Sequence, residues 1–198
     1  MSDLEDIQKK LVNFCQILPQ HVQTWKDTLV AMQDPLRALC NFCEQLHSVE
    51  EAHITYIENF EIIQRDLQVK ILGHIEEELE ALKPQIERLN KYNHDLKNKL
   101  TTLERATIDL DWDLKSSVLQ GSPIQPPLDK LLQMAYEFWI FFSEALKNMN
   151  NNLKTVNVRD EKSMDKCQKA LKVDLADNNK VYALLAITQY IINEKAVM

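Results

Sequence analysis

The fold class is decided by the segment "LDKLLQMAYEFWIFFSEALKNMNNNLKTV", residues 128–156. Its apolar side chains recur at spacings of three and four, which is the period of one face of an α-helix. We assign them to a first stripe (Leu128, Leu132, Ala135, Trp139, Phe142, Leu146, Met149, Leu153 and Val156) and a second one (Met134, Phe138, Phe141 and Ala145). Two stripes predict burial on more than one side, either inside a bundle or against another chain.

The glycine content extends this interpretation to the whole chain. Among 198 residues there are two glycines, Gly73 and Gly121, and glycine supplies the tight turns of β-hairpins and phosphate-binding loops. Sheet-rich and α/β folds are therefore disfavoured, and the sequence contains no glycine-rich nucleotide-binding motif. The sequence predicts an all-α fold, an elongated bundle of long kinked helices with a shorter C-terminal helical part.

The N-terminal region has helical periodicity from Leu4 to Leu46. Asp34 followed by Pro35 is typical of a helix N-cap and its first residue, so we expect the helix to restart or kink there.

A second long helix is predicted from near Ile54 to Lys115, with a kink or a split at Pro84. Its apolar stripe consists of Leu67, Ile71, Ile75, Leu79, Leu82, Ile86, Leu89, Leu96, Leu100, Leu103, Leu110 and Leu114. These regions form the first of three predicted parts, an N-terminal region of long antiparallel helices over residues 1–115.

Glycine and proline mark the second part, a linker over residues 116–127, because these residues end helices. The third part, residues 128–198, is a C-terminal helical region. In addition to the helix from Leu128, it should contain one helix at 160–173 and another that begins near a possible N-cap at Asp177.

The charge balance limits the classes of molecule that the chain is expected to bind. The chain has 23 Lys and Arg against 30 Asp and Glu, a net charge of −7, and nucleic-acid backbones need a basic face. We therefore expect no direct nucleic-acid binding. No signal peptide is visible, and no apolar run approaches the length of a membrane span, so an intracellular protein is expected.

A metal site is the sharpest chemical hypothesis. Cys40, Cys43 and His47 would share one helix face, whereas His53 falls beyond the helix end. Zinc needs four ligands, usually from a loop or from two elements, and Cys43 lies on an apolar stripe, where free cysteine commonly packs as a small hydrophobic side chain. We favour core packing over metal binding or redox chemistry, and expect no cofactor.

Two further motifs are weaker. Asp109, Asp111 and Asp113 imitate the start of a calcium loop, but the required glycine and glutamate are missing further along. His74 and Glu78 lie one helical turn apart, and we interpret them as an ordinary surface pair. No catalytic signature occurs, which favours a non-enzymatic protein.

The residues that suggest a family lie in "WKDTLVAMQDPLRALCNFCEQLHS", residues 25–48. This block resembles the N-terminal part of the AIRIM family of ribosome maturation factors. The matching residues are Trp25, Leu29, Leu36, Leu39, Asn41, Glu44, Gln45 and Leu46. The likeness continues through the "LQGSPIQPP" linker to "YIINEK". The polar tract "KNMNNNLKT", residues 147–155, departs from it, because a more basic helix is expected there.

The resemblance implies a non-enzymatic adaptor of the nucleus and cytoplasm. Members bind an AFG-two-type AAA+ ATPase, form a heterodimer with a CINP-like helical protein, and act indirectly on pre-60S ribosomal particles. Candidate interface residues are Trp25, Leu29, Phe138, Trp139, Phe141 and Phe142, since interfaces favour aromatic anchors. The alternatives are the CINP-like partner itself and a coiled-coil subunit of a kinetochore or tethering complex. A small helical metalloenzyme would rest on Cys40, Cys43 and His47 alone.

Overall fold

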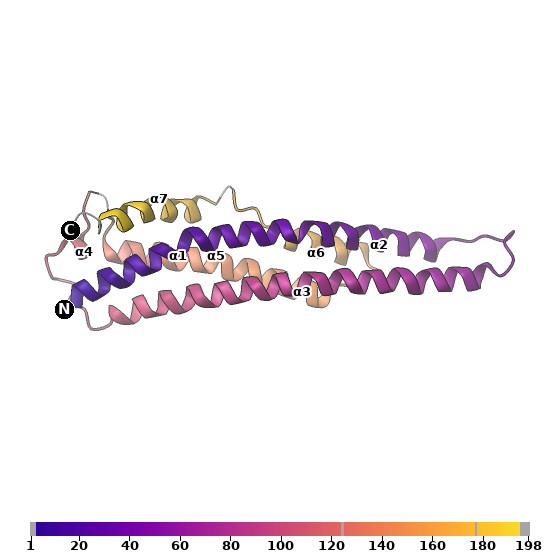
Figure 1. Cartoon of the computed structure of the whole chain (residues 1–198), viewed down its shortest axis with the longest axis horizontal. Helices are drawn as coiled ribbons and strands as arrows, with labels where there is room; N and C mark the ends of the chain where they lie inside the picture. Colours follow the sequence, from indigo (N-terminus) through magenta and orange to yellow (C-terminus); the bar gives the residue numbers. More distant parts are fainter. Residues whose placement is uncertain (1–2, 124, 177, 195–198) are drawn as a thin grey trace. The chain divides into compact units, whose positions relative to one another are not determined.

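In the computed structural model, which describes residues 3–123, 125–176 and 178–194, every regular element is a helix. Figure 1 shows the helices in chain order: α1 (Asp3–Ala31), α2 (Gln33–Glu51), α3 (Phe60–Ala106), α4 (Ser117–Gln120), α5 (Leu128–Thr155), α6 (Glu161–Leu171) and α7 (Asn179–Glu194). The predicted all-α class is confirmed.

Two compact units make up the chain. Unit 1 consists of Met1–Lys26, Leu89–Glu144 and Asp174–Met198, and unit 2 of Asp27–Arg88 and Ala145–Val173. Helices α1, α3 and α5 each supply residues to both units. These ranges differ from the three sequence regions 1–115, 116–127 and 128–198, and the glycine- and proline-rich segment lies inside unit 1.

The core of unit 1 is built by α1, α3, α5 and α7. Its buried side chains include Ile7, Leu11, Phe14, Leu18, Leu96, Leu100, Leu103, Leu131, Phe138, Phe142, Val181, Leu184 and Ile191. On α1 and α3 they follow the predicted stripes, because helical positions three or four apart lie on one face.

The buried face of α5 differs from the prediction. The fully buried positions are Leu128, Leu131, Ala135, Phe138, Phe142 and Met149. Leu132 and Trp139, which we placed in the first stripe, are half-buried. The predicted register was wrong at these positions because apolar residues occur in pairs here, and spacing alone cannot choose within a pair.

The core of unit 2 is built by α2, α3, α5 and α6. It contains Leu36, Leu39, Cys43, Leu46, Ile71, Ile75, Leu82, Ile86, Leu146, Met149, Met164, Cys167 and Leu171. Of the apolar residues predicted for the start of the α3 stripe, Ile71, Ile75, Leu82 and Ile86 are buried, whereas Leu67 is exposed.

The helix does restart near Pro35, but not at the predicted residue. Met32 is the N-cap of α2, and Asp34 belongs to its first turn. Pro35 is then the third helical residue, where a backbone N–H would have no partner within the helix. Proline is therefore tolerated at this position without serving as the first residue.

The boundaries of α3 also correct the prediction. The helix begins at Phe60 rather than near Ile54, and ends at Ala106 rather than at Lys115. Asn59 has a φ of 57°, a left-handed conformation that asparagine tolerates and a helix interior does not. The helix continues through Pro84, so of the predicted alternatives, a kink or a split, the split does not occur.

The two C-terminal helices lie close to their predicted positions. Asp160 is the N-cap of α6, and its side chain accepts a hydrogen bond from the backbone N–H of Lys162. Before α7, the side chain of Asn178 accepts from the N–H groups of Lys180 and Val181, both at 3.1 Å. The predicted N-cap of this last helix, Asp177, lies outside the described residues.

Gly73 provides a stability prediction because it lies inside α3 with open space around it. A Cβ atom added there would meet no heavy atom within 4 Å, and glycine costs a helix interior about 0.5–1 kcal/mol relative to alanine. Gly73→Ala should raise the free energy of unfolding by that amount in urea titrations. The control is Gly121→Ala, which should destabilise: φ is 85° and Pro127 Cδ lies 2.9 Å from the added Cβ. Destabilisation by Gly73→Ala would contradict the prediction.

Candidate partner-binding surface

Exposed apolar side chains gather at the end of unit 2 formed by the loop after α2 and the start of α3. They are Tyr56, Ile57, Ile62, Ile63, Leu67 and Val69. Tyr56 is 86% exposed, Ile63 53% and Leu67 43%. A single exposed apolar residue is ordinary, but six within 14 positions (56–69) are a concentration of exposed apolar area.

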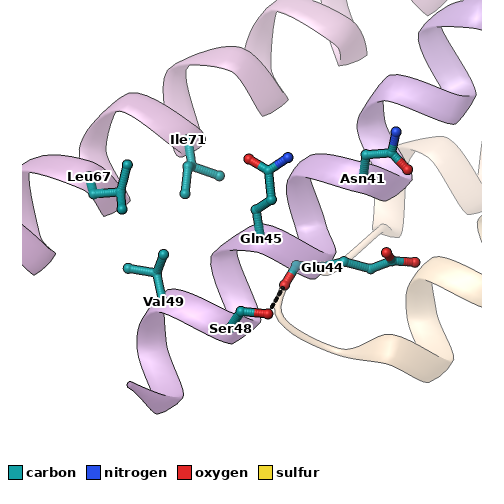
Figure 2. A pocket seen from close by; sticks show the side chains of 7 residues that line it. All are labelled: Asn41, Glu44, Gln45, Ser48, Val49, Leu67 and Ile71. Atoms are coloured by element: carbon teal, nitrogen blue, oxygen red, sulfur yellow. Dashed lines mark hydrogen bonds between the residues drawn. The ribbon is translucent and has the colours of Figure 1, made fainter. Parts of the chain in front are cut away.

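A groove runs beside these residues between α2 and α3. Figure 2 shows Leu67 and Ile71 from α3 and Val49 from α2, with Gln45 reaching between the two helices. We call this feature, lined by Asn41, Glu44, Gln45, Ser48, Val49, Leu67 and Ile71, the α2–α3 groove. Its volume is about 520 Å³. Because Ile63, Leu67 and Ile71 are four residues apart, they lie on one face of α3 and extend the apolar floor of the groove beyond its lining.

Hydrogen bonds hold the end of α2 against α3. The side-chain amide of Gln64 donates to the carbonyl oxygens of Val49 (2.6 Å) and Ala52 (3.1 Å). Carbonyl groups in the last turn of a helix have no partner within the helix, so Gln64 caps α2 from the neighbouring helix. These hydrogen bonds therefore join the two helices that line the groove.

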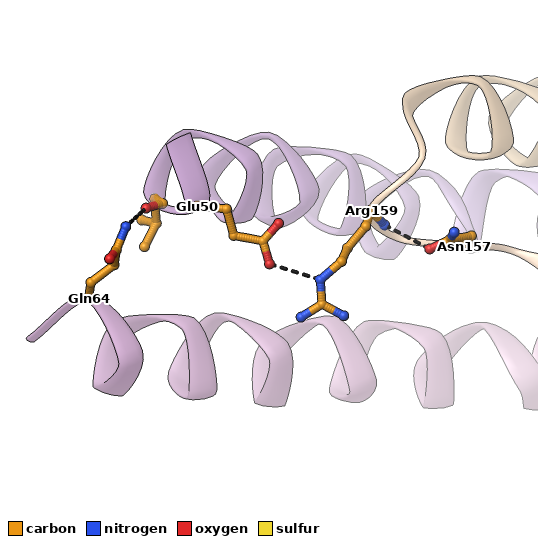
Figure 3. A network of polar contacts seen from close by, with 5 residues as sticks. Glu50, Gln64, Asn157 and Arg159 are labelled. Carbon is orange, nitrogen blue, oxygen red and sulfur yellow. Dashed lines mark hydrogen bonds and ion pairs between the residues drawn. The ribbon is translucent and has the colours of Figure 1, made fainter. Parts of the chain in front are cut away.

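An ion pair joins the same end of α2 to the segment before α6. Arg159 Nε donates to Glu50 Oε1 at 2.8 Å, and the Arg159 backbone N–H donates to Asn157 Oδ1 at 3.1 Å (Figure 3). Both ionic groups are partly exposed, so the pair contributes less than about 1 kcal/mol. It positions the loop rather than stabilising the fold.

The sequence segment that supplies most of the groove lining is acidic. Residues 41–70 contain six carboxylates and two cations, namely Glu44, Glu50, Glu51, Glu58, Glu61 and Asp66 against Arg65 and Lys70. Of the six, Glu50 is paired with Arg159 and Glu51 with His47. This segment therefore carries more negative than positive charge, which favours basic partners.

Three of the predicted interface residues lie in the core of unit 1. Trp25, Phe138 and Phe142 are fully buried, with ring centroids of Trp25 and Phe142 4.9 Å apart. Trp25 Nε1 donates to Asn93 Oδ1 at 3.1 Å, and Asn93 Nδ2 donates to the Phe142 carbonyl at 3.0 Å. These aromatic residues pack within the chain itself.

The other predicted interface residues keep accessible surface. Trp139 and Phe141 in unit 1 are half-buried, as is Leu29 in unit 2. Lys97 Nζ lies 4.1 Å from the ring centroid of Trp139, a cation–π contact that covers one face of the indole. Sequence spacing had not separated these three residues from the buried ones.

The cysteines fall into the arrangement that core packing predicts. Cys43 and Cys167 are buried in unit 2, and Cys40 is half-buried, with its sulfur 3.3 Å from Gln168 Nε2. Burial raises the pKa of the Cys43 and Cys167 thiols to about 11, and of Cys15 to about 12. Neutral thiols are poor nucleophiles and poor metal ligands.

The remaining chemical motifs lie apart from one another. His47 pairs with Glu51 at 3.2 Å, and His53 lies in the loop beyond α2, as predicted. Asp109, Asp111 and Asp113 lie in the turns after α3. Among the described residues no three His, Cys, Asp or Glu side chains are arranged to hold a metal ion.

The His74 surface pair exists with a different partner. His74 Nδ1 lies 3.1 Å from Glu77 Oε2, not against Glu78. Its ring stacks on Phe42 of α2, with centroids 5.0 Å apart. The contact therefore joins two helices of unit 2, which a motif read along one helix could not reveal.

The fold and the groove define an all-α helical-bundle protein with an exposed apolar surface. The chain matches the family CA109-like, "Ribosome biogenesis protein C1orf109-like", over residues 5–190. It therefore belongs to this family of ribosome biogenesis proteins, which is the AIRIM family that residues 25–48 resemble. Comparison with curated proteins finds no match. In the described part of the chain, no helix is both long and apolar enough to cross a membrane.

Proposed function

We propose that this protein is a non-enzymatic adaptor of ribosome biogenesis in the nucleus and cytoplasm. It pairs with a CINP-like helical protein and connects it to an AFG-two-type AAA+ ATPase that acts on cytoplasmic pre-60S particles. Membership of a family of ribosome biogenesis proteins supports the part of the proposal that concerns ribosome biogenesis. The observation that carries the adaptor role is the exposed apolar surface of unit 2, residues 56–69 with the α2–α3 groove.

The half-buried face of α5 supports a second contact. Trp139 presents half-buried aromatic area beside Tyr136, and the two ring centroids lie 5.7 Å apart. Phe141 is half-buried on another face of α5, where its ring packs 5.0 Å from that of Phe142. Aromatic side chains of this kind supply the anchors of protein interfaces. An adaptor needs at least two separate surfaces, and unit 1 and unit 2 each carry one.

Affinity purification from cells followed by mass spectrometry tests the proposal. A tagged chain should recover an AAA+ ATPase and a CINP-like helical protein in near-stoichiometric amounts, and depletion of the chain should leave pre-60S particles immature. The matched variants are Trp139→Ala, which removes part of the proposed surface on α5 and should lower the recovery of a partner, and Tyr190→Ala, which removes an exposed ring from α7 and should not. Recovery of neither partner by the unmodified chain would refute the adaptor function.

A further inference from the structure

We infer that the α2–α3 groove binds an amphipathic helix of a partner protein, and that the faces of that helix flanking its apolar stripe are basic. This inference rests on the proposed adaptor function and specifies the chemistry of one partner. It uses the geometry of the groove, its charge, and the exposure of its floor.

The geometry favours a helical occupant. Ile63, Leu67 and Ile71 lie at successive positions four residues apart on α3, and Val49 faces Leu67 and Ile71 from α2 (Figure 2). Two helices side by side present a groove that side chains of a third helix, spaced by three and four, can fill. Ile71 is already buried, while Ile63 and Leu67 remain exposed, so no element of the described residues covers the outer part of the floor.

The polar residues of the groove fit such an occupant. Ser48 Oγ donates to the Glu44 carbonyl within α2 at 2.9 Å, so the hydroxyl proton is used inside the helix. Asn41 and Gln45 line the groove with amide groups that can both donate and accept hydrogen bonds. Glu44 also lines the groove, but its carboxylate points away from α3 (Figure 2), so it could accept a hydrogen bond only from a cationic side chain at the edge of a docked helix.

The acidic charge of residues 41–70 distinguishes between the molecules that could occupy the α2–α3 groove. Residues 41–70 carry six carboxylates against two cations, so lysine and arginine on the flanks of a docked helix would be attracted. A second copy of this chain is disfavoured, because it would bring the same acidic surface and a net charge of −7. Like charges facing each other across an interface are unfavourable.

Synthetic helical peptides test the inference with the purified full-length chain. One fluorescent peptide carries a leucine stripe flanked by lysines, a second replaces the lysines with glutamates, and a third replaces the leucines with serines. Fluorescence anisotropy should show saturable binding of the lysine peptide. The glutamate and serine peptides should bind with an affinity lower by about tenfold or more. Added salt should weaken the binding of the lysine peptide.

Leu67→Asp separates groove binding from simple charge attraction. The variant adds a negative charge, so a peptide held by charge alone would bind it as tightly or more tightly. A peptide seated in the groove should lose about tenfold or more in affinity, because an apolar contact is removed. Ile63→Asp, at a residue 53% exposed, is the second variant. Ile108→Asp is the matched control, since Ile108 is 72% exposed and belongs to unit 1.

Several outcomes would overturn the inference. These are equal binding of the lysine and glutamate peptides, undiminished binding by both aspartate variants, or self-association of the unmodified chain that Leu67→Asp abolishes. The last result would assign the groove to a second copy. If the tagged chain recovers its ATPase and helical partner while these peptide results are negative, the adaptor function stands and only the groove assignment fails.

Discussion

Trp25→Ala is expected to lower the free energy of unfolding by about 3–5 kcal/mol, the usual cost of truncating a large buried aromatic side chain. Trp25 is fully buried and its ring packs 4.9 Å from that of Phe142. Its indole N–H is also the donor to Asn93 Oδ1. Alanine therefore removes apolar contacts and leaves a buried amide oxygen without its donor. Urea unfolding followed by circular dichroism measures the loss.

Two further variants isolate the causes. Trp25→Phe keeps most of the apolar burial but removes the donor, and should cost about 1–3 kcal/mol. Trp139→Ala truncates the same residue type at a half-buried position and should cost clearly less than Trp25→Ala. An equal loss of stability for the two alanine variants would contradict the placement of Trp25 in the core of unit 1.

Acid should destabilise the protein through His21. This side chain is 3% exposed and packs against Phe138 and Phe142, and burial lowers its pKa from 6.5 to about 4. As the pH falls from 6.5 towards 4, the unfolded chain takes up a proton that the folded chain does not bind. The free energy of unfolding therefore decreases over this window, by up to about 3 kcal/mol from this one group.

His21→Leu reveals that contribution by difference. The variant also removes Nε2, which is buried and has no hydrogen-bond partner among the described residues. Between pH 6.5 and 4 its stability should fall less steeply than that of the unmodified chain. His53→Leu, at an exposed loop residue, is the control and should follow the unmodified chain. If the stability of His21→Leu and of the unmodified chain fell in parallel over this pH range, burial would not lower the pKa of His21.

The helices were predictable where a single apolar stripe leaves no choice. On α3, Ile71 to Leu103 follow the expected face, and the stripe has a gap between Leu89 and Leu96 that Asn93 occupies. An asparagine in a leucine stripe can be recognised as an exception, but its partners on α1 and α5 are set by tertiary contacts. From the sequence alone, no prediction was made for Asn93.

The ends of α3 show why boundaries were harder. The loop "HITYIEN", residues 53–59, has apolar residues at helical spacing, yet the helix begins only after Asn59 adopts a positive φ. That choice depends on the local backbone, which apolar periodicity does not report. The candidate binding surface was not predicted: Ile57 and Ile63 fell within the helix expected from near Ile54, and no exposure was assigned to them.

The Asn93 amide has a consequence for folding accuracy. Sliding α3 by one turn would bring Leu89 or Leu96 to the place of Asn93, and the buried Trp25 N–H would lose its acceptor. Leucine packing alone tolerates such a shift, whereas an unpaired buried polar group penalises it. The Asn93 side chain thus specifies the register of α3, because it disfavours shifted arrangements of the helices that would bury the leucines equally well.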